Sequence, residues 1–175
     1  MPHIHTNPGQ HDQTASAFIV RTDGPEPQLM LHWHKKLHVW LQFGGHVELH
    51  ENPWETVTHE LLEESGYELG QLKLLQPKMR IKETSDSIMH PVALYDQTHT
   101  MPGAQPLHFH TDRGYGFFTD QEPLHKPQDG ESVKFKLFSL DEIRALPPSD
   151  IPIDIYEIAE FLLAINLKDW DLVTL

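Results

Sequence analysis

Residues 44–67 read GGHVELHENPWETVTHELLEESGY and carry the clearest helix signal in the chain. Asn52 is a good N-cap, a proline follows at the first helical position, and Glu55 completes the spacing of a capping box. Gly66 supplies a stop signal. An apolar stripe at the i, i+3, i+7 spacing is formed by Trp54, Val57 and Leu61. The pattern predicts an amphipathic helix over residues 52–65.

The same helix has an unusual charge pattern. From Leu37 to Leu72 the chain has no lysine or arginine, yet Glu60, Glu63 and Glu64 stand at i, i+3 and i+4 and share one helix face. Like charges at this spacing destabilise a helix by roughly 0.2–0.5 kcal/mol per pair. A solvated acidic face is the alternative, but such a face usually interleaves lysine with glutamate. Clustered carboxylates after a double glycine favour a site for Mg²⁺ or Mn²⁺.

Composition narrows the class of protein. The 175 residues contain 13 Lys plus Arg and 26 Asp plus Glu, a net charge of −13. This charge repels phosphate backbones and anionic lipid, so we expect neither a nucleic acid nor a membrane as partner. The absence of cysteine excludes disulfides, thiolate metal sites and cysteine nucleophiles. No apolar run approaches ~18 residues and the first residues do not resemble a signal peptide, so we expect a cytoplasmic protein. We also expect it to be a monomer or a homodimer.

Short apolar runs separated by turn residues predict the rest of the fold. We expect residues 1–14 to be a flexible N-terminal arm and residues 15–175 to be one domain. Strands are expected at 15–21, 28–33, 38–43, 71–76, 79–81, 90–95, 106–118 and 132–139. Two further helices are expected at 140–146 and 152–167, and long loops at 96–105 and 120–131. This order suggests a mixed sheet packed between helices.

The acidic helix and its lead-in resemble the Nudix box. That motif is a glycine, five residues, a glutamate, seven residues and then Arg-Glu-apolar-any-Glu-Glu-any-Gly-apolar; here residues 45–51 read GHVELHE and residues 59–67 read HELLEESGY. The segments LHWHKKLHVWLQFGGHVE, HFHTDRGYGFF and LFSLDEI are also similar to a bacterial Nudix subgroup. The resemblance implies an α/β/α sandwich with a mixed β-sheet between helices.

The resemblance also implies an activity. It is hydrolysis, dependent on Mg²⁺ or Mn²⁺, of the diphosphate linkage in a nucleoside diphosphate derivative, a small-molecule nucleotide-type substrate. Carried over by position, the metal ligands are Glu60, Glu63, Glu64 and the carbonyl of Gly45, and Glu51 is a supporting carboxylate.

The general base and one box position stay open. Glu60 or a loop carboxylate could act as the base, and Glu131 precedes the strand that leads to LFSLDEI, where Nudix enzymes often have a functional glutamate. A solvated loop residue is the alternative for Glu131. His59 replaces the box arginine, whose planar guanidinium is not matched by imidazole. His59 is still positioned to donate one hydrogen bond to a box carboxylate. The family often has a proline directly before the double glycine, and Phe43 occupies that position here.

Residues outside the box are candidates for substrate binding. Trp40 and Gln42 lie just before the double glycine, and Tyr115 is one of several strand aromatics that could stack a base. The alternative is that these aromatics belong to the core. Arg80, with Lys82 and Arg113, is one of the scarce cations that could meet a phosphate.

Histidine is frequent, with 14 in the chain. His108, His110 and Asp112 alternate, so on a strand they would face one side, a spacing that could bind a transition metal. Hydrogen-bonded surface residues are the alternative. His32, His34 and His38 flank a Lys35-Lys36 turn, and for them we favour a solvated hairpin tip.

Two other functions compete with hydrolysis. An isopentenyl-diphosphate isomerase-like protein shares the fold, but its chemistry relies on a cysteine that this chain lacks. A nucleotide-sensing Nudix domain would bind without turnover; the substitution at His59 favours it, whereas the retained box carboxylates do not. A capped-RNA substrate is disfavoured by the net charge.

Overall fold

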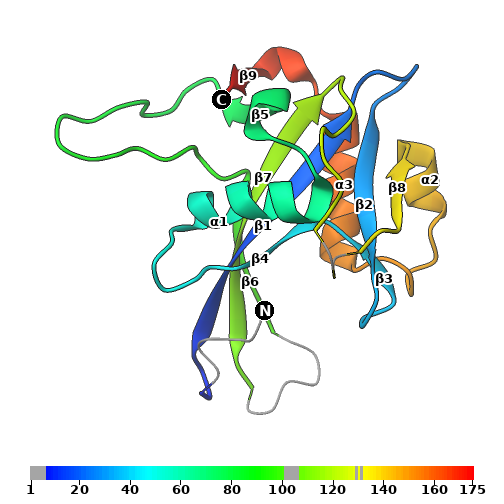
Figure 1. The fold of residues 1–175 in the computed structure, drawn as a ribbon, viewed down its shortest axis with the longest axis horizontal. Helices are drawn as coiled ribbons and strands as arrows, with labels where there is room; N and C mark the ends of the chain where they lie inside the picture. Colours follow the sequence, from blue (N-terminus) through cyan, green and yellow to red (C-terminus); the bar gives the residue numbers. More distant parts are fainter. Residues whose placement is uncertain (1–6, 101–106, 129, 131) are drawn as a thin grey trace.

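The computed structural model describes residues 7–100, 107–128, 130 and 132–175. These residues form one mixed sheet with helices on both faces (Figure 1). The strands are β1 His11–Arg21, β2 Gln28–His34, β3 Val39–Leu41, β4 Phe43–His46, β5 Lys73–Pro77, β6 Tyr95–Thr100, β7 Phe109–Thr119, β8 Phe135–Phe138 and β9 Trp170–Thr174. The helices are α1 Pro53–Glu60, α2 Leu140–Ala145 and α3 Ile153–Ala164.

The centre of the sheet is a long parallel pair, β1 and β7, which run side by side from His11↔Phe109 to Arg21↔Thr119. The main path through the sheet is β3-β2-β1-β7-β5-β9, with β4 paired to β1, β6 to β7 and β8 to β2. The other pairings are antiparallel. The predicted mixed sheet between helices is therefore confirmed.

Two apolar layers result from the alternation of side chains along β1. Ala15, Ala17 and Ile19 face α1 and belong to a buried cluster with Val57 and Leu61. The alternate residues of β1 belong to a second cluster with α2 and α3, whose members include Phe18, Val20, Ile143, Ile155 and Leu162. The sheet is thus covered on both faces, as an α/β/α sandwich requires.

The predicted capping box starts α1 as expected. The Asn52 side chain accepts hydrogen bonds from the backbone N–H groups of Trp54 and Glu55, at 3.0 and 3.1 Å. The Glu55 side chain accepts one from the Asn52 N–H at 2.9 Å. Beyond Glu60 the helix widens into a π-helical turn over Leu61–Ser65, which the sequence did not predict. Such turns occur frequently at functional sites.

Several expected boundaries were wrong. Strand β1 begins at His11, so residues 11–14 belong to the sheet and not to a flexible arm. The last helix ends at Ala164 and the chain returns as β9, which pairs with β5 and occupies the sheet edge. Residues 79–81 and 90–94 form no strand, whereas β6 occupies Tyr95–Thr100, so residues 96–100 are a strand where a loop was expected.

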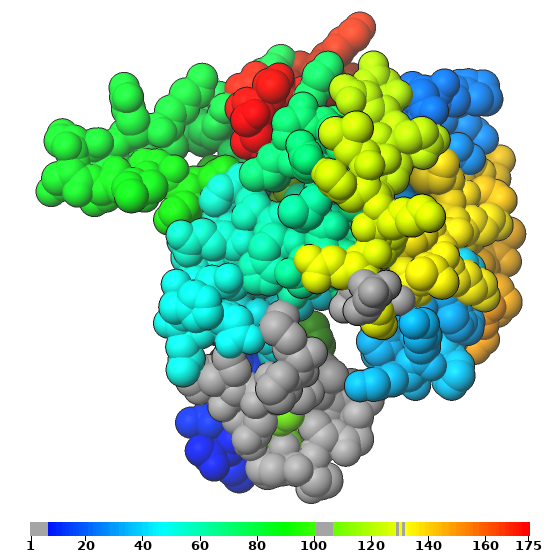
Figure 2. All heavy atoms as spheres, in the orientation of Figure 1, coloured from blue at the N-terminus to red at the C-terminus, as the bar shows by residue number. Residues whose placement is uncertain are grey.

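The segment 78–94 extends away from the body of the molecule as an irregular arm, drawn in green at the left of Figures 1 and 2. Its apolar side chains are unusually exposed, with Met79 at 95% and Ile88 at 85%. Among the helices in the described part of the chain, none is long and apolar enough to cross a bilayer.

His32 makes the stability of this fold pH-dependent. Its ring is buried and stacks on Phe43 with ring centroids 5.4 Å apart. The expectation that His32 belongs to a solvated hairpin tip was therefore wrong. Burial, helped by the nearby His34, lowers the pKa of His32 to about 4. In the unfolded chain the His32 imidazole takes up a proton near pH 6.5, whereas in the folded protein it does so only near pH 4. The folded state therefore keeps its full stability above pH 6.5 and loses part of it as the pH falls from 6.5 toward 4.

We predict that the His32→Phe variant loses less stability than the wild type between pH 7.5 and pH 5, by about 2 kcal/mol. Urea unfolding at both pH values measures this difference. His90→Gln, at an exposed histidine, is the control and should behave as wild type. Parallel loss in the wild type and His32→Phe would contradict the prediction.

Candidate active site

Two of the predicted metal-ligating carboxylates gather at the junction of α1 and the π-helical turn. Glu60 and Glu63, together with His59, each offer one ligand atom, and these atoms all lie within 4.8 Å of one another. Glu60 is buried, whereas Glu63 and His59 are half-buried. The predicted acidic face therefore exists as a compact group of two carboxylates and one imidazole.

His59 contacts the carboxylate at the start of the box. Its Nδ1 lies 3.0 Å from Glu51 Oε1, and its Nε2 lies 3.6 Å from Glu60 Oε1. The second oxygen of Glu51 accepts a hydrogen bond from Thr56 Oγ1 at 2.9 Å. Glu51 is thus held through both oxygens, and His59 bridges two glutamates from the position where the Nudix box has arginine.

Glu64 is used differently from its two neighbours. Its Oε2 accepts a hydrogen bond from the backbone N–H of Gly44 at 2.8 Å, which joins the end of the helix to β4. Gly44 has a φ of +138°, and a Cβ there would stand 2.2 Å from the carbonyl oxygen of Ala15. Only glycine fits this position. Gly45 follows on the same strand, paired with Ala15, and its carbonyl as a metal ligand stays a prediction.

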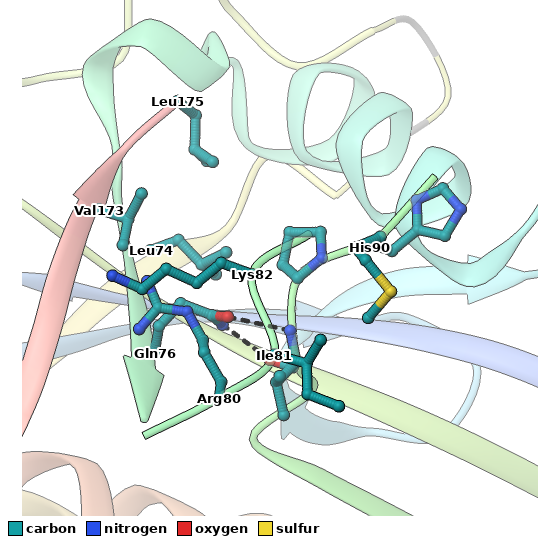
Figure 3. A pocket seen from close by; sticks show the side chains of 11 residues that line it. Leu74, Gln76, Arg80, Ile81, Lys82, His90, Val173 and Leu175 are labelled. Atoms are coloured by element: carbon teal, nitrogen blue, oxygen red, sulfur yellow. Dashed lines mark hydrogen bonds between the residues drawn. The ribbon is translucent and has the colours of Figure 1, made fainter. Parts of the chain in front are cut away.

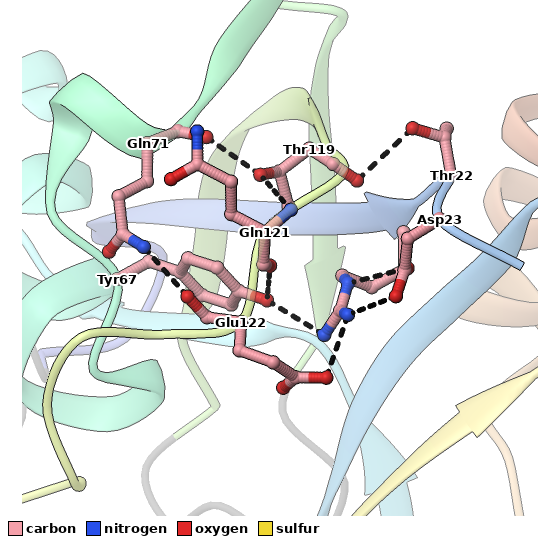
Figure 4. A network of polar contacts seen from close by, with 8 residues as sticks. Thr22, Asp23, Tyr67, Gln71, Thr119, Gln121 and Glu122 are labelled. Carbon is pink, nitrogen blue, oxygen red and sulfur yellow. Dashed lines mark hydrogen bonds and ion pairs between the residues drawn. The ribbon is translucent and has the colours of Figure 1, made fainter.

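A polar network fixes the other end of the box (Figure 4). The buried Tyr67 donates its hydroxyl hydrogen to the carbonyl of Gln121 at 2.8 Å and accepts from Arg21 Nη1 at 3.2 Å. Arg21 also contacts Asp23 and Glu122, at 2.6 and 2.8 Å. The hydrogen bond from Arg21 lowers the pKa of each of these two carboxyl groups and raises the pKa of Arg21 itself. Sequence reasoning missed this network because its members are far apart in the chain.

The loop after β7 satisfies carbonyl groups at the end of the π-helical turn. The N–H of Gln128 donates to the carbonyl of Glu63 at 2.8 Å, and the N–H of His125 donates to that of Gly66 at 3.1 Å. Gly66 has a φ of +76°, and a Cβ there would collide with the His125 carbonyl. Glu131, the predicted loop base, lies outside the described residues.

Two adjoining cavities lie along the segment 80–96, one at the N-terminal end of α1 and the other at strands β5 and β9. The larger, of about 540 Å³, is lined by residues that include Trp54, Arg113 and Tyr115. The smaller, of about 200 Å³, is lined by residues that include Arg80 and Lys82 (Figure 3). The two share the wall formed by residues 90–92.

Side-chain contacts hold the cavity walls. Gln76 exchanges two hydrogen bonds with the backbone of Val92, at 2.7 and 2.9 Å. Trp54 and Tyr115 meet edge to face with ring centroids 5.3 Å apart. Burial raises the pKa of the Tyr115 hydroxyl. Arg80 forms a 2.7 Å ion pair with Asp171, a residue of β9.

The structure places Trp40 and Gln42 elsewhere. Trp40 is 8% exposed and packs on Phe138 and Trp33 in the cluster that faces α2 and α3. Gln42 donates to Ser16 Oγ at 3.0 Å, and Ser16 lies on the face of β1 opposite to Ala15 and Ala17. Trp40 therefore lies in the core, as the alternative interpretation expected, and Gln42 points away from the α1 face; contact of either residue with the substrate stays a prediction.

The predicted trio His108, His110 and Asp112 does not form one group either. Asp112 accepts hydrogen bonds from Thr14, Ser16 and the Tyr95 hydroxyl, at 2.8, 2.9 and 2.7 Å. His110 instead gathers with Asp12 and His46. His110 and Asp112 alternate on β7 as expected, but His108 precedes the strand, and the carboxylate beside His110 is that of Asp12 on β1.

The fold is an α/β/α sandwich, and its first helix carries a carboxylate cluster next to a double glycine. These two features together define the class of protein. A family model described as the NUDIX domain matches residues 10–160, and the chain belongs to this family. It is a Nudix-type hydrolase. No curated protein matches the chain.

Solved structures agree with this assignment. A hydrolase of the NUDIX family from Clostridium perfringens is 26% identical, with a TM-score of 0.67, over 87% of this chain and 95% of that one. The dihydroneopterin triphosphate pyrophosphohydrolase of E. coli is 13% identical, with a TM-score of 0.61, over 90% and 98% of the two chains. The NUDIX domain of Shewanella oneidensis NrtR, complexed with ADP ribose, is 14% identical, with a TM-score of 0.58, over 86% and 84%. The last two are similar in fold.

We predict that Gly44→Ala lowers stability by about 2–4 kcal/mol, because the new Cβ collides with backbone and displaces the N–H that Glu64 accepts. Thermal or urea unfolding measures the loss. Gly70→Ala is the matched control, since a Cβ there meets nothing within 4 Å, and it should change stability by less than ~0.5 kcal/mol. Equal stability of the two variants would show that β4 does not need this close approach.

Proposed function

We propose that this protein is a divalent-metal-dependent diphosphohydrolase that cleaves the diphosphate linkage of a nucleoside diphosphate derivative. The observation that carries the proposal is the compact group of His59, Glu60 and Glu63, held next to the double glycine of β4. Family membership supports the reaction class. The larger cavity, at the N-terminal end of α1, offers room for a small molecule, although its lining residues do not include the carboxylates of the group.

The residues fit a hard divalent ion. Glu60 and Glu63 offer carboxylate oxygens close together, Glu64 lies one residue on, and the carbonyl of Gly45 lies next to the glycine that Glu64 contacts. Oxygen ligands of this kind suit Mg²⁺ or Mn²⁺. When bound, such an ion neutralises diphosphate oxygens and lowers the pKa of a bound water.

The protein's own groups would do the remaining work. Glu60 is buried and held by His59, so its carboxylate is pre-positioned to hold the ion or to accept a proton from water. The contact between Glu51 and His59 keeps both side chains in place without touching the reacting atoms. Glu131, which lies outside the described residues, stays a candidate base.

The paired cavities would bind the organic part and the outer phosphate of the substrate. Trp54 presents aromatic surface in the larger cavity, backed by Tyr115, which is only 3% exposed and belongs to the core; Arg113 lines the same cavity. Arg80 and Lys82 line the adjoining one. Arg80 and Arg113 are ion-paired with Asp171 and Asp96, so an anionic group would bind near Lys82 or compete with these two carboxylates. The ligand in the NrtR complex, ADP ribose, carries such an anionic group.

Nucleotide sensing without turnover is the second candidate. The observation that favours it is His59, which makes a single 3.0 Å contact to Glu51 where arginine could bind both oxygens. Retention of Glu60, Glu63 and Glu64 supports catalysis. The cytoplasmic location and the choice between monomer and homodimer stay predictions.

We predict that the wild type, supplied with Mg²⁺ or Mn²⁺, hydrolyses at least one member of a panel of ADP-ribose, dinucleoside polyphosphates and nucleoside triphosphates. Glu63→Gln should reduce kcat/KM by at least ~100-fold with an unchanged thermal midpoint, because it removes charge and keeps shape. Glu157→Gln, on the exposed side of α3, is the control. Tight binding of ADP-ribose by a wild type that turns over no member of the panel would favour sensing.

We further predict that His59→Ala lowers kcat by about 10–100-fold, because Glu51 and Glu60 lose the group that bridges them. His59→Arg should stay within a few-fold of the wild type, since guanidinium restores the bridge. Steady-state kinetics that separate kcat from KM distinguish positioning of carboxylates from loss of substrate contact. A rise in KM alone would place His59 on the substrate.

A further inference from the structure

A second group of possible metal ligands lies outside the Nudix box. Asp12 of β1, His46 at the end of β4 and His110 of β7 each offer one ligand atom, and these atoms all lie within 4.8 Å of one another. We propose that these three side chains bind one divalent transition-metal ion, with Zn²⁺ as the chemical type. The site is separate from the Mg²⁺ or Mn²⁺ site proposed on α1.

The register of the sheet brings the three residues to one face. Asp12 lies opposite His110 in the parallel pair β1–β7, and Thr14, two residues after Asp12, lies opposite His46 in β1–β4. Partners across strands point to the same side of a sheet, as do residues two apart on one strand. Ala15 and Ala17, of opposite parity on β1, face α1. The cluster therefore lies on the sheet face opposite to α1, near the start of β1, at the bottom of Figure 1.

The spacing of the ligand atoms suits a tetrahedral ion. The distance from His46 Nε2 to Asp12 Oδ2 is 3.5 Å. Two ligands about 2.0–2.1 Å from a tetrahedral Zn²⁺ stand about 3.3 Å apart. The rings of His46 and His110 lie almost perpendicular, at 86°, with centroids 4.9 Å apart. The ligand atom of His110 lies within 4.8 Å of the other two, so His110 would complete a three-ligand set and leave a fourth position for water.

Burial distinguishes this cluster from a surface group of histidines. Asp12 is 1% exposed and His110 is 7% exposed. A carboxylate this deep requires a charged or hydrogen-bonding partner. Each of the three side chains also interacts within the protein, so the ion would convert an existing His–Asp contact into a metal centre.

Neighbouring histidines offer a supporting shell. His99 pairs with His110 across β6–β7, with ring centroids 5.5 Å apart. Its buried Nδ1 has no hydrogen-bond partner among the described residues. His108 is buried just before β7, and its ring centroid lies 5.9 Å from that of His110. Imidazoles around ligating histidines orient them and exclude solvent.

Ligand chemistry separates the two sites. Two imidazoles and one carboxylate select Zn²⁺ and other transition metals, whereas the carboxylates of the box suit Mg²⁺ and Mn²⁺. His46 directly follows Gly45, so an ion here would also fasten the strand that carries the double glycine. The ion would link β1, β4 and β7 and stabilise the native state by mass action.

The test is a Zn²⁺ titration by calorimetry in saturating Mg²⁺, followed by thermal unfolding with and without Zn²⁺. We expect the wild type to bind one Zn²⁺ tightly and to gain several degrees in thermal midpoint. His110→Asn and Asp12→Asn should bind at least ~100-fold more weakly and lose the gain. Co²⁺ in place of Zn²⁺ should give an intense visible absorption band in the wild type, which these variants lack.

Three further variants keep the result decisive. The His46 side chain is only 13% exposed, but it lies at a strand end. His46→Asn therefore replaces His110→Asn or Asp12→Asn if that variant unfolds without metal. Glu63→Gln should retain the Zn²⁺ site, and so should the double variant His3→Ala, His5→Ala in the N-terminal region. Unchanged affinity in His46→Asn, or loss of the tight site in Glu63→Gln or in the double variant, would overturn the proposal.

Discussion

The hydrogen bond from the Gly44 N–H to the Glu64 carboxylate is the contact on which the site depends. It joins β4 to the π-helical turn at 2.8 Å, at a strand position where a Cβ would stand 2.2 Å from the carbonyl oxygen of Ala15. Because β4 lies so close to β1, the helix packs directly on the sheet and its acidic side chains meet beside the double glycine. His59 then ties the start of the box to its helix. A short box with few cations can thus hold several carboxylates in one place.

Local signals in the sequence predicted the parts of the structure that local interactions build. The capping box at Asn52 and Glu55 fixed the start of α1, and the spacing of the glutamates identified the acidic face. The π-helical turn was missed because no residue pattern distinguishes it from α-helix. Strand β9 was missed because its pairing with β5 joins segments almost a hundred residues apart, and propensity does not report such partners. The signal available was the β-prone run WDLVT at residues 170–174.

In the candidate site, too, local signals predicted some residues and long-range pairing placed the others. Residues inside the box were found by spacing, whereas residues outside it depend on register. Trp40 was expected at the substrate because it precedes the double glycine, yet strand β3 turns it into the core beneath α2 and α3. The alternation of residues 108, 110 and 112 placed His108 near His110, but it could not show that Asp112 accepts hydrogen bonds from β1 hydroxyls while Asp12 lies beside His110. Sequence periodicity gives the face of a strand and not its neighbours.

The parallel pairing of β1 with β7 also constrains when the protein can fold. His11 lies opposite Phe109, so the central pair closes a loop of roughly a hundred residues before it gains its ladder of hydrogen bonds. On the ribosome, β1 can pair early with β2 and β4, but its edge on the β7 side stays open until β7 has been synthesised. Helix α1 is made well before its sheet is complete. Completion of the sheet beneath α1 is therefore a late event in the life of the nascent chain.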